Sequence, residues 1–416
     1  MTTIKDSVHD HIEVEGVGAA LLDSPPVQRL RRVSQLGTAS LVYPSANHTR
    51  FEHSLGVYAL ATRALENLGI RGRDARAVRA AALLHDVGHA PMSHTIEELL
   101  YRRTNRYHDD VAPLIGSGDI AAILEAHDVD PDRVAALIAG EARLGQLLAG
   151  ELDVDRMDYL VRDAHHTGVP YGTIDIERLL RALRFVGGDL VLAEGNVQTA
   201  ESLLVARALM NPTVYNHHVA RIGKRMLQRA TFRLLESGTA TASEVALMDD
   251  PALRVALRDV ERAAPLAERL ADRRLYKRAI WAEYGDVGED LATELLEAEP
   301  EAVRETEAEI AARATVGVDE VLLDVQGPPT MQESTTKVTV NGEIRELTDQ
   351  STLVSALERV QLEQWRLGVY APEPLSEAVG TAAAAVLGLD IEGGRIAETD
   401  SPGRYTSLAD FQGGHR

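Results

Sequence analysis

The first 235 or so residues carry apolar side chains at helical spacing, which predicts a run of amphipathic helices. The stretch 75–84, rich in Ala and Leu, predicts a buried helix. One short β-hairpin around 190–192, bounded by glycine turns, is expected to interrupt the helices. The clearest apolar stripe consists of Leu55, Ala59, Leu60, Ala64 and Leu68. Shorter helices are expected at 120–125, 132–139, 144–148 and 155–165.

The rest of the chain has a helical part and a β-rich part. Residues 240–313 are rich in Ala, Leu, Glu and Arg and predict further helices. Beyond them, VLLDV and KVTVNGEIREL predict strands, with Asn341 and Gly342 as a type I′ hairpin turn, and helices are expected at 352–361 and 375–387. We therefore predict a mainly α fold with a small α+β appendage. The expected segments are 1–235, a helical extension at 236–316, the appendage at 317–392 and a flexible tail at 393–416.

The composition excludes several classes of function. Because none of the 416 residues is cysteine, disulfides, iron–sulfur clusters and thiolate metal sites are excluded, and a metal would need His, Asp or Glu ligands. The chain has 64 acidic and 43 basic residues and a formal net charge of −21, which argues against a nucleic-acid partner. Apolar runs of about 18 residues are missing, and the N-terminus lacks the pattern of a signal peptide. We expect a cytoplasmic protein with no membrane partner.

The charged residues also suggest an adaptation to salt. Nearly all basic residues are Arg, and the excess acids are spread along the chain instead of gathered in one tail. We interpret this as a halophilic-type acidic surface, in which dispersed carboxylates keep the protein hydrated when charges are screened. A GC-rich genome alone would also produce the Arg bias.

Most of the 14 histidines lie between residues 48 and 166, and LLHDVGHAPMSH is the richest segment. There an apolar helix delivers His85 and Asp86 at its end, with His89 one turn later. Pro91 then turns the chain before His94. An adjacent imidazole and carboxylate can aim at one point and bind Mn, Fe, Co, Ni or Zn, with Mg an alternative if oxygen ligands dominate. A lone HD dipeptide would be explained by chance.

Two further segments make chance a poor explanation. HTRFEHSLGV supplies His53, and ELDVDRMDYLVRDAHHTG supplies Asp155 among other acids, which together give an H…HD…D series. This series resembles the HD superfamily of phosphohydrolases. The strings SPPVQRLRRVSQLGTASLVYPSANHTRFEHSLGV, LLHDVGHAPMSH and LDVDRMDYLVRDAHHTG resemble its deoxynucleoside triphosphate triphosphohydrolase (dGTPase-like) branch, which includes the animal enzyme with a sterile-alpha-motif module. The match covers about residues 4–225 and implies that residues 1–235 are an HD-domain helical bundle.

The resemblance assigns four metal ligands, His53, His85, Asp86 and Asp155. Asp153 is a rival for the last position, although we interpret it as the acid that starts the helix. The family reaction is hydrolysis at the α-phosphate, which releases a deoxynucleoside and intact triphosphate.

The catalytic candidates lie around the HD motif. The resemblance makes His94 the general acid, and Glu97, three residues on, can reach back to it. His89 and His108, the latter beside Asp109, are expected to contact phosphate or to support the metal ligands. The plain alternative for each histidine is a surface residue or one satisfied in the core.

A polyanionic substrate also needs cations and sugar contacts. The resemblance implies phosphate contacts from Arg50, Arg156 and Arg207. It places Tyr215 against the sugar, where a 2′-hydroxyl would collide, and Gln35, Tyr159 and Asp163 around the 3′-hydroxyl and base. Pro212 must kink the helix between Arg207 and Tyr215.

Regulation and assembly follow less directly from the sequence. The family's regulatory nucleotide site aligns with Asp23, Arg31, Arg273 and Lys277, whereas Lys5 and His218 depart from the family pattern. A solvated helix face or a subunit contact explains these charges equally well. We expect a homo-oligomer, dimer or tetramer. Two rival functions are an HD phosphodiesterase or nucleotidase for another nucleotide, and a non-catalytic regulator that binds nucleotides or nucleic acid.

Overall fold

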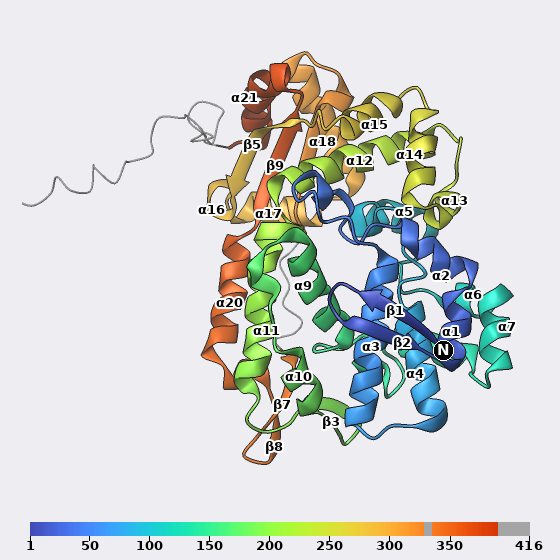
Figure 1. The fold of residues 1–416 in the computed structure, drawn as a ribbon. Coiled ribbons are helices and arrows are strands. Elements are labelled where there is room, and N and C mark those ends of the chain that lie inside the picture. The colour runs from blue at the N-terminus through green and yellow to red at the C-terminus, as the bar shows by residue number, and fades with distance from the viewer. Residues whose placement is uncertain (328–334, 390–416) are drawn as a thin grey trace, which may run out of the picture. The chain divides into compact units, whose positions relative to one another are not determined.

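The computed structural model describes residues 1–327 and 335–389, which form two compact units (Figure 1). The first unit combines residues 1–275 with 335–361, and the second combines 276–327 with 362–389. These units differ from the segments expected from the sequence, because the chain leaves the first unit, returns to it and leaves again. The tail predicted at 393–416 lies outside the described residues.

The first unit is mainly helical, as predicted. In its helical core, α3 packs against α4 and α9. Helix α3 begins after Thr49, which forms a capping box with Glu52. The helices are α1 (Gly16–Leu22), α2 (Pro25–Arg29), α3 (Arg50–Asn67), α4 (Gly72–Leu84), α5 (Glu97–Thr104), α6 (Ala112–Ile115), α7 (Gly118–Ala126), α8 (Pro131–Ile138), α9 (Val154–Thr167), α10 (Ile176–Ala182), α11 (Val197–Met210), α12 (His218–Glu236), α13 (Ala242–Leu247), α14 (Asp250–Arg258), α15 (Ala264–Ala271), α19 (Leu347–Gln350) and α20 (Thr352–Glu363), whose last residues run into the second unit.

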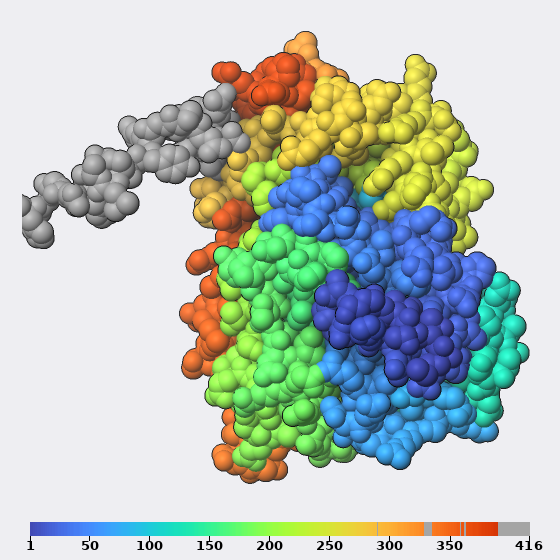
Figure 2. All heavy atoms as spheres, viewed as in Figure 1, coloured from blue at the N-terminus to red at the C-terminus, as the bar shows by residue number. Residues whose placement is uncertain are grey.

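An N-terminal hairpin of β1 (Thr2–Asp6) and β2 (Asp10–Val14) precedes these helices. The two strands pair antiparallel, and Ile12 and Val14 are buried in the core of the unit. Figure 2 shows the hairpin, in dark blue, on the outer face of the unit. The expectation that only the hairpin near 190 interrupts the helices of residues 1–235 was therefore wrong. The alternation in DHIEV is short, and the turn before it contains no glycine.

A four-stranded sheet joins distant parts of the first unit. Its order is β3 (Leu183–Val186), β4 (Asp189–Leu192), β7 (Lys337–Val340) and β8 (Glu343–Glu346). The predicted hairpins β3–β4 and β7–β8 are both present, and Asn341 and Gly342 have the positive φ of 54° and 78° that a type I′ turn needs. The hairpins meet where Leu192 of β4 pairs in parallel with Val338 of β7.

The second unit has a three-stranded antiparallel sheet in the order β5 (Lys277–Glu283), β9 (Arg366–Ala371), β6 (Leu322–Val325). Its core includes Trp365 and Leu367. The sequence predicted only helices for 240–313, and β5 corrects this, since an irregularity between Arg278 and Ile280 interrupts the alternation that marks a strand. Its helices are α16 (Tyr284–Val287), α17 (Glu289–Glu297), α18 (Pro300–Ala314) and α21 (Ser376–Leu387).

Two local features bear on the predictions. The kink expected at Pro212 is a π-helical turn, Asn211–Tyr215, that follows α11. Within the described residues, none of the helices combines the length and the apolar composition needed to pass through a lipid bilayer.

Candidate metal centre and active site

Four predicted ligands from three helices converge at one point. The Nε2 atom of His53 lies 3.3 Å from Nε2 of His85 and 2.7 Å from Oδ1 of Asp155. Asp86 Oδ1 lies 3.4 Å from His85 Nε2, and Asp155 Oδ1 lies 3.7 Å from the same nitrogen. His53, His85 and Asp86 offer donor atoms that all lie within 4.8 Å of one another. The four residues of the H…HD…D series therefore lie together in the fold.

The helix ends explain how the sequence delivers these groups. His53 lies in the first turns of α3, and His85 caps the C-terminal end of α4, with Asp86 next to it. Asp153 is the N-cap of α9, where its side chain accepts a hydrogen bond from the backbone nitrogen of Arg156 at 2.7 Å. Asp153 is thus the helix-starting acid, and Asp155 projects from the first turn toward the histidines.

The donor set fits a divalent metal. The Nδ1 atom of His85 donates to the carbonyl of Ala82 at 2.8 Å, and Nδ1 of His53 donates to Asp158 at 2.7 Å. Each ring therefore keeps Nε2 for the site, which is the arrangement that metal-binding histidines need. Two imidazole nitrogens and two carboxylates suit a borderline transition metal.

The electrostatics of the ligands favour a cation. Burial alone would lower the pKa of His53, but Asp155 and Asp158 reverse this and raise it to about 10. Burial would raise the pKa of Asp155, whereas His53 and His85 lower it below the usual range. The carboxylates thus stabilise positive charge on the neighbouring imidazoles. A metal cation can take the place of the imidazole protons.

A second cluster lies beyond the HD motif. His94 Nδ1 contacts Glu97 at 2.6 Å, and His108 Nδ1 contacts the other oxygen of the same carboxylate. The His89 ring stacks on that of His108 with centroids 4.0 Å apart, and His89 Nε2 lies 3.2 Å from Asp86. Donor atoms of these three histidines and Glu97 also lie within 4.8 Å of one another. The pair His94–Glu97 therefore has the geometry expected from the sequence.

A cavity of about 940 Å³ opens beside the two clusters. Its walls include seven of the predicted residues, namely His85, His108, Asp109, Asp155, Arg156, Tyr159 and Arg207. They also include residues to which the sequence analysis gave no role, among them Gln146, Asp189, Thr335, Thr336 and Lys337. Lys337 reaches this wall through the pairing of β7 with β4 and forms an ion pair with Asp189 at 2.9 Å. The sequence alone could not reveal this position, because Leu192 and Val338 pair in space although 145 residues lie between them along the chain.

Four of the residues predicted to bind substrate do not line this cavity. Arg50 is buried and donates to Asp86 at 3.0 Å and to Ser93 at 2.8 Å. Asp163 is held between His48 at 2.8 Å and the hydroxyl of Tyr215 at 2.9 Å. Gln35 is buried, and its backbone nitrogen donates to the carbonyl of His48. Tyr215 meets the cavity wall indirectly, because its ring lies edge-on to that of Tyr159 at 6.2 Å.

The predicted regulatory residues fall in both units. Asp23 caps α1, Arg31 stacks over Phe51 at 3.6 Å, and Arg273 donates to the carbonyl of Leu41 at 2.9 Å. These three belong to the first unit, whereas Lys277 begins β5 of the second. A regulatory nucleotide site stays a prediction.

The chain is similar to known proteins over most of its length. Residues 50–163 match the family model of the HD domain, and residues 174–398 match that of the HD associated region. The chain is 33% identical over 377 residues to an uncharacterized protein of Methanocaldococcus jannaschii, which covers 90% of this chain and 80% of that protein. Its fold is similar to that of a hypothetical protein from Aquifex aeolicus, with a TM-score of 0.74, 29% identity, and coverage of 92% and 99% of the two chains.

One group of relatives has a named activity. The chain is 31% identical over 240 residues to the deoxynucleoside triphosphate triphosphohydrolase SAMHD1 homolog of Dictyostelium discoideum. This match covers 52% of the chain and 46% of the relative, so the chain spans about half the length of that protein.

Proposed function

Because this chain belongs to the HD-domain phosphohydrolases that carry an HD-associated region, we propose that it hydrolyses deoxynucleoside triphosphates to a deoxynucleoside and triphosphate. The observation that carries the proposal is the convergence of His53, His85, Asp86 and Asp155 at one point, where His85 and Asp155 line a nucleotide-sized cavity. These four residues would hold one divalent cation. When bound, such a cation polarises a phosphoryl oxygen and lowers the pKa of a coordinated water.

His94 supplies the proton that the leaving group needs. Water adds to the α-phosphorus, the bond from phosphorus to the 5′-oxygen breaks, and His94 protonates that oxygen. Its side chain is 57% exposed, so a substrate can reach it, while Glu97 fixes the ring from the other side. Partial desolvation of the ring, together with the charges of Arg50 and His108, lowers the pKa of His94, and Glu97 partly opposes them. A bound polyanion opposes them further and favours the protonated acid.

Cations around the cavity neutralise the phosphates. A triphosphate carries about four negative charges near neutral pH, and Arg156, Arg207 and Lys337 line the cavity wall. Arg50, which the family resemblance assigns to phosphate, donates a hydrogen bond to Asp86. His89, His108 and Asp109 complete this end of the site.

Selection of deoxyribose is assigned to the aromatic side of the cavity. Tyr159 lies on the wall, and Tyr215 supports it from behind while its hydroxyl is fixed by Asp163. This crowding disfavours a 2′-hydroxyl, and Gln35 is expected to join it on substrate binding. A homo-oligomer, and a regulatory nucleotide site that includes Asp23, Arg31 and Arg273 of the first unit, stay part of the proposal.

Product analysis tests the function directly. Purified protein with Mn²⁺ or Mg²⁺ is mixed with each deoxynucleoside triphosphate, and products are separated by ion-exchange chromatography. We expect equal amounts of deoxynucleoside and unbroken triphosphate. Release of orthophosphate, or a linear dinucleotide from a cyclic dinucleotide substrate, would instead identify another HD hydrolase.

The control is the double variant His85→Ala, Asp86→Ala. It should lose turnover, because it lacks two of the four ligands. If neither the wild type nor the double variant turns over any substrate, and both bind nucleotide equally well, the non-catalytic regulator is favoured.

A further inference from the structure

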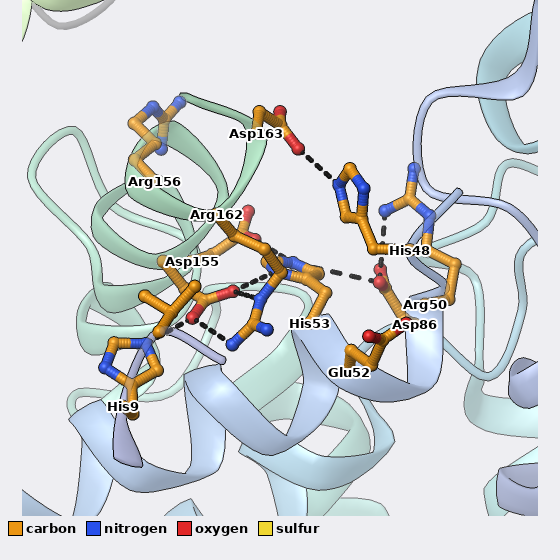
Figure 3. A network of polar contacts seen from close by, with 12 residues as sticks. His9, His48, Arg50, Glu52, His53, Asp86, Asp155, Arg156, Arg162 and Asp163 are labelled. Atoms are coloured by element: carbon orange, nitrogen blue, oxygen red, sulfur yellow. Dashed lines mark hydrogen bonds and ion pairs between the residues drawn. The ribbon is translucent and has the colours of Figure 1, made fainter. Parts of the chain in front are cut away.

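We infer that the N-terminal hairpin is a working part of the metal centre, in which Asp6 and His9 are positioning residues for the ligand His53. They act through Asp158 and Arg162, which link the hairpin to the ligand by hydrogen bonds. Figure 3 shows His9, Arg162 and His53 in this network. The inference rests on the proposed metal site, and within the described residues neither Asp6 nor His9 is hydrogen-bonded to any of the four ligands.

The first link is the hydrogen bond from His53 Nδ1 to Oδ2 of Asp158, at 2.7 Å. Both side chains are almost fully buried, with 1% and 0% exposed. A carboxylate at Nδ1 keeps the proton on that nitrogen and fixes the ring plane, so that the lone pair of Nε2 faces the site. The orientation of Asp158 therefore sets the orientation of the ligand.

The second link holds Asp158 itself. Arg162, one turn later on α9, donates to Oδ2 from Nε at 2.9 Å and to Oδ1 from Nη2 at 3.0 Å. His9 approaches from the hairpin, and its Nε2 lies 2.5 Å from Oδ1. Three donors thus fix one buried carboxylate, and one of the three comes from the hairpin.

The third link closes the network on the hairpin. Arg162 Nη1 donates to Asp6 Oδ2 at 2.9 Å, and the buried guanidinium lies between two carboxylates. Asp6 Oδ1 also accepts from the backbone nitrogens of Val8 and His9 at 2.9 and 2.8 Å. Asp6 therefore both anchors Arg162 and shapes the turn that presents His9. Removing it leaves a buried Arg with one partner fewer and a displaced His9.

Gly56 provides an independent sign that the space is built for this network. It lies on α3, almost one turn after His53. A Cβ atom there would overlap Oδ1 of Asp158 and would lie 2.5 Å from Nη2 of Arg162. Only glycine lets α3 approach the ion pair closely enough for His53 to bond Asp158.

The test measures the affinity for Mn²⁺ alone, by competition with a fluorescent chelator, in Asp6→Asn and His9→Gln. The control is Asp10→Asn, which changes an acid of the same hairpin that is 71% exposed and pairs with Lys5 and His11. Residues that hydrogen-bond to metal ligands typically affect metal affinity about 10- to 100-fold. We therefore expect Asp6→Asn and His9→Gln to bind Mn²⁺ about tenfold more weakly than wild type, and the control to bind it as wild type does. With saturating Mn²⁺, both variants should recover most of the wild-type kcat with an unchanged KM.

The outcomes separate this inference from the proposed function. If wild-type protein does not bind Mn²⁺, the metal site itself is refuted. If wild type binds and both variants bind within twofold of it, the hairpin has no positioning role and the metal site stands. Should Asp6→Asn unfold, His9→Gln decides alone, because it removes a single contact to Asp158 and leaves Arg162 paired. A loss of kcat that excess Mn²⁺ does not restore would also overturn the inference.

Discussion

Replacing Gly88 with alanine should separate the two clusters of the active site. Gly88 lies inside the HD motif, two residues after Asp86 and directly before His89. A Cβ atom at this position would lie 2.1 Å from the backbone oxygen of His108 and 3.2 Å from Cγ1 of Val111. The glycine therefore allows two backbone segments to pack in direct contact.

The expected magnitude follows from that distance. Real Cβ atoms essentially never come closer than 3.0 Å to such an atom, so the segments must move apart by about 0.9 Å. The backbone nitrogen of His108 donates to Glu97 at 3.1 Å, and Glu97 holds His94, so the acid moves relative to the metal ligands. A displacement of about 1 Å can cost about 100-fold in rate, and overpacking costs about 1–3 kcal/mol of stability.

The assay is the release of deoxynucleoside under steady-state conditions, with bound metal measured in parallel by atomic emission. We expect kcat to fall about 100-fold while metal content stays at the wild-type level. Gly285→Ala is the matched control, since an added Cβ there meets no described atom within 4 Å. A Gly88→Ala protein with kcat within twofold of wild type would refute the reasoning, and so would a loss of activity that merely parallels a loss of metal.

Three further predictions test the site and the surface. Glu97→Gln removes the carboxylate that raises the pKa of His94, and His94 must be protonated to act as the acid. The alkaline limb of the kcat/KM profile should therefore move to lower pH, with about tenfold less activity at pH 8. The control Glu98→Gln, which changes an exposed neighbour, should leave the profile in place. Asp155→Ala should abolish metal retention, whereas Asp153→Ala should keep the metal and lower the free energy of unfolding by about 1 kcal/mol, because the N-cap is lost. Metal analysis and thermal unfolding check this, and the opposite result would assign the ligand to Asp153. If the net charge of −21 reflects adaptation to salt, the thermal midpoint should rise between low and molar KCl, and a flat or falling midpoint would contradict that interpretation.

The ligand set comes from the resemblance of the H…HD…D series to the HD superfamily, and two local signals support it. An apolar helix ends at His85, and Asp153 starts a helix, so the local structure around His85, Asp86 and Asp155 can be inferred without tertiary knowledge. The same holds for the β7–β8 hairpin, where Asn341 and Gly342 determine the turn. The positions of Lys337 and of His9 depend instead on contacts between segments about 150 residues apart, which no local pattern encodes.

Strands β1, β2 and β5 were not predicted, for a related reason. In β5 the irregularity beside Arg278 shifts the register, so the apolar residues do not alternate as a regular strand requires. In β1 and β2 the five-residue strands are too short for the pattern to stand out, and the turn places Asp10, not glycine, at a φ of 64°. Acids and histidines in this hairpin were visible, but their use in a buried network depends on α9 packing nearby.

The strand order of the second unit constrains how the protein can be made on the ribosome. Strand β9 pairs with both β5 and β6, yet it is synthesised after both of them and after the β7–β8 hairpin of the first unit. Nascent chains that stop before residue 366 therefore present two unpaired strand edges that await the same partner. A truncated product ending there would be a natural target for chaperones and proteases, even though the HD motif had already been translated.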